Sequence, residues 1–409
     1  MKMSIPAFIF FTSFILATSS TEASYFDTLP EGRFNLQYRR IKTNSVVSNY
    51  DTNGLLTSNN INFKLNAESL MGSNQILDEY FSDLKNISSE AYLNFQIGAY
   101  EIKPVANIEV EVLGFGYGLG DKTTAYFGIP FYKASVKVDF NRTEGNNYKE
   151  ISEMVEDSDS GIVGRITQGL PDISEGIIQT VLTEYYGTKA LGTWTASGPG
   201  DLEAGIMHQL HKDKSFGSLI KFGTVLPTGK VEDPDILQDI SFGDGQVDVF
   251  FEGGVGGKFL SHLGYTLSAR YTYQMDSQKT YRVPDVEGVS LGVNKTQVTE
   301  KLGNKIDLFS ALSFEAFDLF TFQLGHYFNH QQKTTILSSN GALFKGSNIF
   351  SPSQGHSAEV KFTFSTVKSY LKNKSFFLPF DLSASYLKTL SGINIQEVNR
   401  STLQLSMYF

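Results

Sequence analysis

Apolar and polar side chains alternate along most of this chain. Leu403, Leu405, Met407 and Phe409 fall on every second position, and the residues between them are Thr, Gln, Ser and Tyr. Alternation of this kind places the two sets of side chains on opposite faces of a β-strand. The pattern recurs over the whole length, and charged residues keep to the second face. It predicts strands that present one face to lipid and the other to a polar lumen.

The pattern predicts an all-β fold, a transmembrane antiparallel β-barrel of about 14 strands within a range of about 12–16. Connections alternate between short ones, which should face the periplasm, and long ones, which should face the exterior. Residues 67–89 break this rule, because they form a long connection on the short side. The predicted strand spans are 33–42, 58–66, 90–100, 105–118, 123–140, 201–211, 216–227, 245–258, 263–274, 302–315, 318–331, 356–370, 376–389 and 397–409.

Two segments show helical rather than strand periodicity. In the first, Ile76, Leu77, Tyr80 and Phe81 lie on one helical stripe. The second lies within residues 141–200, which are expected to form a long extracellular loop. Residues 67–89 could therefore be a short helical plug in the lumen, or both helices could pack on the rim of the barrel.

The first residues have the features of an export signal. Lys2 precedes an apolar run over residues 4–17, and small residues follow up to Ala23. The run is shorter than the roughly 18 residues that a spanning helix needs. We therefore expect residues 1–23 to be a secretory signal peptide and residues 24–409 to be the barrel.

Composition agrees with this class of protein. The chain contains 33 Phe, 20 Tyr and no Cys, which suits strands and aromatic girdles in an exported protein held without disulfides. Its net charge of −9 argues against a nucleic-acid partner. No spacing of His or acidic residues suggests a metal, and no cofactor is expected.

Four segments occur in an order that resembles one family. They are YGLGDKTTAYFGIPF (117–131), GDLEAGIMHQL (200–210), FGTVLPTGK (222–230) and FGDGQVDVFFEGGVGGKF (242–259). They resemble the outer-membrane transporters linked to the meta-pathway of phenol degradation, which are similar to FadL-like hydrophobic-compound channels. The resemblance implies passive transport of hydrophobic small molecules. The Asn-Pro-Ala element of the fatty-acid channels has no counterpart here, which leaves the 67–89 segment as the substitute for their hatch.

The strand over residues 123–140 changes parity. Its apolar residues occupy odd positions up to Phe131 and even positions from Ala134 onward. The change predicts a bulge or kink near Pro130, Tyr132 and Lys133. In the fatty-acid channels an interrupted strand opens a lateral door, so the candidate substrate path contains these three residues together with Ile76, Leu77, Tyr80 and Phe81. The alternative is a bulge without a transport role.

Charged residues on the polar faces of strands should point into the lumen. Their mixed signs argue against strong selectivity for one type of ion. The expected lumen-facing residues are Glu109, Glu111, Asp248, Arg270, Asp307, Glu359, Lys361 and Asp381.

The sequence as a whole predicts a channel of the bacterial outer membrane for passive uptake of hydrophobic or aromatic small molecules. A general diffusion porin and a structural or surface-interaction barrel remain alternatives. No enzyme is expected, because the spacing of His326 and His330 to the following Ser-Asn-Gly element does not match outer-membrane phospholipases. Expected partners are outer-membrane lipid, a small hydrophobic solute and the barrel-assembly machinery, and we expect a monomer. The assembly signal would be Leu403, Leu405, Met407 and Phe409.

Overall fold

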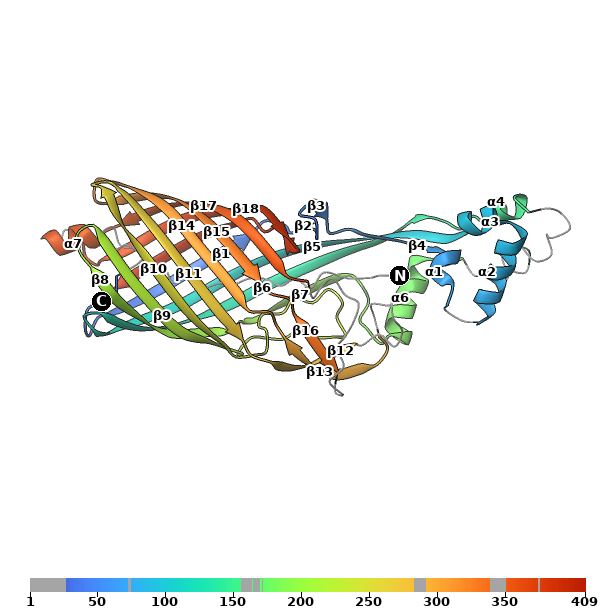
Figure 1. The fold of residues 1–409 in the computed structure, drawn as a ribbon, viewed down its shortest axis with the longest axis horizontal. Coiled ribbons are helices and arrows are strands. Elements are labelled where there is room, and N and C mark those ends of the chain that lie inside the picture. The colour runs from blue at the N-terminus through green and yellow to red at the C-terminus, as the bar shows by residue number, and fades with distance from the viewer. Residues whose placement is uncertain are drawn as a thin grey trace.

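The computed structural model describes residues 27–72, 75–155, 164, 170, 172–282, 292–338, 351–373 and 376–409. The predicted signal peptide lies outside these residues. Within them, twelve antiparallel strands pair in a closed ring, which forms the barrel in Figure 1. The predicted barrel is therefore confirmed.

Most neighbouring strands in the ring are consecutive in the sequence, as in an up-and-down barrel. The ring closes where β5 pairs with β6. In spatial order it runs β5 (Gln96–Gly120), β1 (Phe34–Thr43), β20 (Arg400–Tyr408), β18 (Phe380–Ile393), β17 (Ser353–Ser365), β15 (Phe320–Gln331), β14 (Lys305–Ala316), β11 (Leu263–Gln274), β10 (Asp248–Leu260), β9 (Phe216–Leu226), β8 (Leu202–Lys212) and β6 (Thr123–Glu144).

Twelve strands lie at the lower end of the predicted range, because two predicted strands form one strand and a third does not cross the barrel. The predicted strands 90–100 and 105–118 belong largely to β5, one continuous strand of 25 residues. The predicted strand 58–66 corresponds to β4 (Ile61–Asn66), which pairs with β5 only between Gln96 and Ile102. It does not cross the barrel, so the chain between β1 and β5 stays at one end.

The two ends of the barrel differ in the length of their connections. At one end, residues 121–122, 213–215, 261–262 and 317–319 make short turns, and α7 (Val367–Asn373) precedes β18. Long connections lie at the other end. Since short turns face the periplasm in outer-membrane barrels, the end with the long connections is extracellular.

β5 and β6 continue beyond the extracellular rim and form an arm with β4 (Figure 1). The arm carries a helical tip made of α1 (Ala67–Leu70), α2 (Gln75–Ile87), α3 (Ser89–Asn94) and α4 (Tyr148–Glu153). The tip has its own apolar core, in which Phe81 and Phe95 meet edge to face with ring centroids 5.1 Å apart. Its buried residues are Ala67, Phe81, Leu84, Ala91, Phe95, Ile97, Ile151 and Val155.

The structure corrects the predicted plug. Residues 67–72 and 75–89 lie at the end of the arm and not in the lumen (Figure 1). Phe81 is fully buried in the tip, Leu77 and Tyr80 pack against the same cluster, and Ile76 is 62% exposed. The apolar stripe of α2 is therefore explained by packing within the tip.

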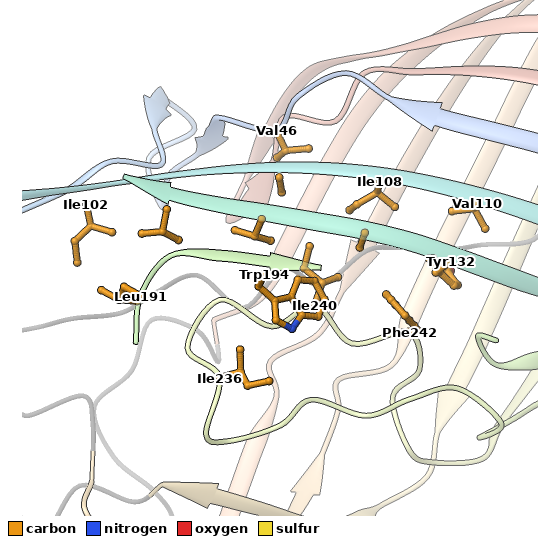
Figure 2. Close-up of a cluster of buried hydrophobic side chains, with 14 of the residues drawn as sticks. Val46, Ile102, Ile108, Val110, Tyr132, Leu191, Trp194, Ile236, Ile240 and Phe242 are labelled. Carbon is orange, nitrogen blue, oxygen red and sulfur yellow. The ribbon is translucent and has the colours of Figure 1, made fainter. Parts of the chain in front are cut away.

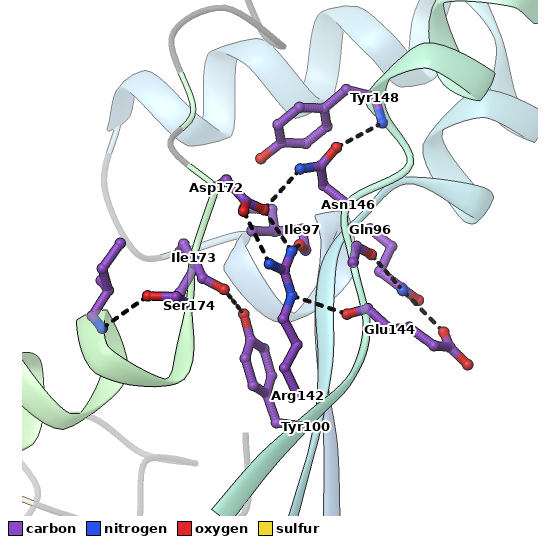
Figure 3. Close-up of polar contacts among 12 residues, drawn as sticks. Gln96, Ile97, Tyr100, Arg142, Glu144, Asn146, Tyr148, Asp172, Ile173 and Ser174 are labelled. Carbon is purple, nitrogen blue, oxygen red and sulfur yellow. Dashed lines mark hydrogen bonds and ion pairs between the residues drawn. The ribbon is translucent and has the colours of Figure 1, made fainter.

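A polar network fixes the base of the tip (Figure 3). Arg142 at the end of β6 donates to both carboxylate oxygens of Asp172, at 2.6 and 3.1 Å, and to the carbonyl of Ile97 at 3.1 Å. Tyr100 of β5 donates to the carbonyl of Ile173 at 2.6 Å. Segments far apart in the sequence are therefore held together at this point.

The remaining elements lie at the extracellular end. Helix α6 (Glu175–Thr180) and the π-helix η2 (Val181–Tyr185) precede β7 (Thr193–Pro199), which pairs with β6. Two small sheets also lie here. The first contains β12 (Ser277–Arg282), β13 (Lys295–Lys301) and β16 (Thr335–Ser338). The second contains β2 (Ser48–Tyr50), β3 (Leu56–Ser58) and β19 (Ile395–Gln396). No helix among the described residues is long and apolar enough to cross a membrane.

Candidate functional site: the lumen and its apolar cap

The predicted bulge in β6 is wrong. β6 pairs with β5 without a register shift through Pro130↔Val112, Tyr132↔Val110 and Ala134↔Ile108. Even-numbered residues of β6 are buried from Thr124 to Val138, so the inner face never changes parity. The surroundings of the strand change instead: the outer face of β6 is apolar at Phe131 and charged at Lys133.

The neighbouring strand carries the irregularity instead. β6 pairs with β8 up to Gly128↔Glu203 and with β7 from Phe131↔Pro199 onward, so the partner side has one extra residue near Gly200. Pro130 has no N–H to donate at this position, whereas its carbonyl accepts from Gly200 N at 2.7 Å. The interruption belongs to the junction of β7 and β8.

A cluster of buried apolar side chains covers the inner face of β5 and β6 where these strands leave the barrel (Figure 2). We call this cluster the apolar cap. Residues 227–247 and β7 supply its opposite side. Its members are Val46, Ile102, Ala106, Ile108, Val110, Val112, Tyr132, Ala134, Val136, Val138, Leu182, Leu191, Trp194, Ile236, Ile240 and Phe242.

Tyr132 lies at the barrel side of the apolar cap. Its ring stacks on Phe242 with centroids 5.1 Å apart and planes inclined by 8°. A side chain on Gly200 would overlap the ring of Tyr132 and lie 2.8 Å from Pro130, so these residues close tightly around that glycine. Pro130 thus faces inward next to the cap and Tyr132 faces inward within it, while Lys133 faces outward, 3.9 Å from Glu111.

Arg282 ties the extracellular segments together around the cap. Its guanidinium donates to Asp235 at 2.5 and 3.1 Å, to Gly187 O at 2.9 Å and to Val293 O at 2.8 Å. Lys295 adds a bond to Asp235 at 2.7 Å. The hydrogen bond from Lys295, and then those from Arg282, hold the pKa of Asp235 below its ordinary value.

One side of the lumen, formed by β8, β9, β10 and β11, contains paired charges; we call it the β8–β11 wall. Arg270 of β11 reaches past two strands to Glu203 of β8 at 3.0 Å, and its guanidinium lies 3.6 Å from the centroid of Phe250. Lys221 of β9 pairs with Glu252 of β10 at 3.1 Å. Opposite charges on this wall therefore largely cancel.

Aromatic rings fold over glycines on the same wall. A Cβ on Gly223 would lie 2.5 Å from the ring of Phe250 and 2.5 Å from the carbonyl oxygen of Ala204. A Cβ on Gly205 would similarly meet the Tyr126 hydroxyl at 3.0 Å. The absence of side chains at these positions lets the rings lie along the wall.

The opposite side, formed by β1, β20, β18 and β17, is the β1–β17 wall. Glu359 accepts from Tyr327 at 3.0 Å and Ser385 at 2.8 Å, and Asp381 accepts from Tyr408 at 2.7 Å. Arg39 donates to Gln404 at 3.0 Å. Lys361 and Arg400 also face the lumen on this wall, from β17 and β20 respectively.

Six of the eight predicted lumen charges face inward in the structure, namely Asp248, Arg270, Asp307, Glu359, Lys361 and Asp381. Glu109 and Glu111 do not. They occupy the outer face of β5, where Glu109 pairs with Arg40 at 3.2 Å and Lys42 at 3.4 Å. The prediction failed because these strands continue above the membrane, where the outer face becomes polar.

Glu203, Glu252 and Arg400 were missed by the sequence analysis. Glu203 shares parity with Gly205 and Met207, and Glu252 shares parity with Asp248. Tracing the inward-facing positions along β8 and β10 would have identified Glu203 and Glu252. No group of three or more His, Cys, Asp or Glu side chains in the described part of the chain is arranged to hold a metal ion.

No protein-family model matches this chain, and no curated protein matches it. Solved structures do. The COG4313 outer membrane channel from Pseudomonas putida F1 is 11% identical, with a TM-score of 0.52 over 94% of this chain and 98% of that chain. A Pseudomonas aeruginosa FadL homologue (9% identity, TM-score 0.34, 96% and 93% covered) and the Ralstonia pickettii toluene transporter TbuX (10%, 0.35, 93% and 90%) are less similar in structure.

The closed barrel and the similarity to the COG4313 channel define a class: the protein is an outer-membrane β-barrel with the fold of that channel. The outer-membrane barrel fold predicted from the sequence is confirmed, and so is the location in the bacterial outer membrane.

Proposed function

We propose that this protein is a channel for passive uptake of hydrophobic or aromatic small molecules. The observation that carries the proposal is the continuity of one surface. The inner face of β5 and β6 is apolar in the cap, at Ile108, Val110 and Tyr132, and leads directly to the small residues Gly114 and Gly128 inside the barrel.

An apolar solute gains free energy by leaving water for such a surface, at about 25 cal/mol per Å² of apolar area buried. The cap is assembled partly from residues 227–247, which contribute Ile236, Ile240 and Phe242 and form no strand of the barrel. Displacement of this segment would expose the apolar face without opening the barrel ladder.

A general diffusion porin is less well supported. A porin needs a water-filled path through the barrel, whereas here the extracellular approach passes the apolar cap.

The test is uptake by intact cells that produce the protein in their outer membrane. Radiolabelled benzyl alcohol and naphthalene should enter faster than in cells without it. Ile240→Gln, which places an amide in the cap, should reduce this gain. Leu93→Gln at the tip, where Leu93 is 74% exposed, is the matched control and should not. Equal entry with and without the protein would refute the proposal.

A surface-interaction role is the second candidate, because the arm holds a separately packed tip beyond the rim. Replacing Ala67–Asn94 with a short Gly/Ser connection separates the two functions. A channel should keep its uptake, whereas a surface-interaction protein should lose its adhesion to other cells or surfaces.

A further inference from the structure

We propose that the β1–β17 wall binds the anionic head of an amphipathic solute, and that the preferred solute is a small organic carboxylate with an apolar body. This inference rests on the proposed function and narrows its substrate class. No residue of this wall belongs to the apolar cap, so the two sites would hold different parts of the solute or act on it in turn.

Three cationic side chains point into the lumen from three strands of the β1–β17 wall. They are Arg39 on β1, Arg400 on β20 and Lys361 on β17. Strand β18 lies between β17 and β20, and its residue Ser385 is opposite Lys361 of β17 and Thr402 of β20. The register places the three charges in one cluster, because Arg39 lies opposite Gln404 of β20, and Thr402, across Ser385 from Lys361, lies between Gln404 and Arg400 on the same face of β20.

The carboxylates near this cluster accept hydrogen bonds from hydroxyl groups. Glu359 takes the Tyr327 and Ser385 hydroxyls, and Asp381 takes that of Tyr408. Among the described residues, neither Lys361 nor Arg400 makes a side-chain hydrogen bond or an ion pair. Two cations that are usually paired when they lie inside a protein are therefore available to a ligand.

On the β8–β11 wall, by contrast, cations that face the lumen form ion pairs. Lys221 has Glu252 at 3.1 Å, and Arg270 has Glu203 at 3.0 Å. The β1–β17 wall contributes three cations against two carboxylates, Glu359 and Asp381, which leaves one positive charge in excess. Polar groups that could accept or donate to a bound carboxylate surround it, at Ser383, Ser385, Thr402 and Gln404.

A carboxylate suits this cluster. A guanidinium can hold both of its oxygens through parallel hydrogen bonds, and an ammonium adds a point charge. A neutral solute of the same shape would leave both cations without a partner. The apolar body of the solute is recognised elsewhere, by the cap.

The experiment measures equilibrium binding to the purified full-length barrel by calorimetry. Benzoate should bind about tenfold or more tightly than benzyl alcohol, since charge-assisted hydrogen bonds exceed neutral ones. Lys361→Gln with Arg400→Gln should remove most of this difference. Lys388→Gln is the matched control, because Lys388 lies on the outward face of β18 and should leave both affinities unchanged. Inorganic phosphate distinguishes a general anion site from a site for organic acids.

Equal affinity for benzoate and benzyl alcohol in the wild-type protein would overturn the inference, as would a double variant that keeps the preference. Phosphate binding as tightly as benzoate would overturn the assignment to organic carboxylates. If the double variant does not fold, the wild-type preference must still weaken as salt rises, and a salt-independent preference would refute the site. Uptake of benzyl alcohol by cells tests the proposed function separately, because it does not involve the cations.

Discussion

Phe34 and Phe409 pair with each other where β1 meets β20. Phe34 N donates to Phe409 O at 3.2 Å, and Phe409 N donates to Phe34 O at 2.9 Å. Their rings stack with centroids 4.8 Å apart and planes inclined by 15°. Phe115 of β5 continues the stack at 6.1 Å from Phe34. Strands from opposite ends of the described chain are thus joined at the periplasmic edge by both backbone and side-chain contacts.

Phe409→Ser should weaken this closure. Loss of the aromatic pair costs about 0.5–1.5 kcal/mol beyond the lost burial, so the barrel should lose its heat-modifiable migration on gels at a lower temperature. Phe377→Ser is the control, because Phe377 is fully exposed at 100%. If the two variants unfold at the same temperature, the Phe34–Phe409 pair does not stabilise the closed barrel. A drop in assembled barrel in cells, with normal refolding in detergent, would support the predicted recognition by the assembly machinery.

Gly223→Ala should destabilise the barrel by about 1–3 kcal/mol, as overpacking usually does. The new methyl group would lie 2.5 Å from both the Phe250 ring and the Ala204 carbonyl. Gly253→Ala is the matched substitution one strand away, where a Cβ meets nothing within 4 Å. Denaturant unfolding should separate the two variants, and equal stability would contradict the packing argument.

Arg282→Ala should loosen the apolar cap. The side chain of Arg282 is only 6% exposed, and hydrogen bonds to charged groups contribute about 1.5–3 kcal/mol. Hydrogen exchange of residues 233–242 should therefore accelerate, while exchange in β14 and β15 stays unchanged. Arg282→Lys keeps the charge without the planar fork and should fall between. Unchanged exchange in the alanine variant would show that other contacts hold this segment.

Acid should release the base of the helical tip. Hydrogen bonds from Arg142 hold the pKa of Asp172 below its ordinary value. The stabilisation is therefore fully present above the ordinary Asp pKa of about 3.9 and is lost as pH falls through the lower folded-state value. Pepsin digestion at a series of acidic pH values should cut the tip increasingly as pH falls. Asp172→Asn should lose most of this dependence, and an identical profile for both proteins would exclude this ion pair as the cause.

Alternation predicted the barrel well because it depends only on strand geometry and on the contrast between lipid and lumen. It failed at Lys133 and Glu111, where strand geometry continues but the lipid ends. A one-residue slip and a change of surroundings produce the same apolar pattern, and only the pairing of Pro130 with Val112 distinguishes them. Sequence alone could not separate these causes.

The plug was predicted on the wrong side for a related reason. Ile61–Asn66 alternates like a membrane strand, so counting it as one reversed the side assigned to the next connection. β4 instead pairs with the outer part of β5. The helix itself was predicted correctly, since Phe81 and Leu84 are buried, but periodicity does not say which surface they are buried against.

The length of β5 has a consequence for what can approach the cell. Its 25 residues, at about 3.3 Å each, make a strand of about 80 Å. A tilted strand needs only about 9–11 residues to cross the membrane. The arm therefore carries the helical tip well beyond the extracellular rim. A flat body that approached the cell along the barrel axis would meet the tip, on which Ile76 and Leu93 are exposed, before it met the mouth of the barrel.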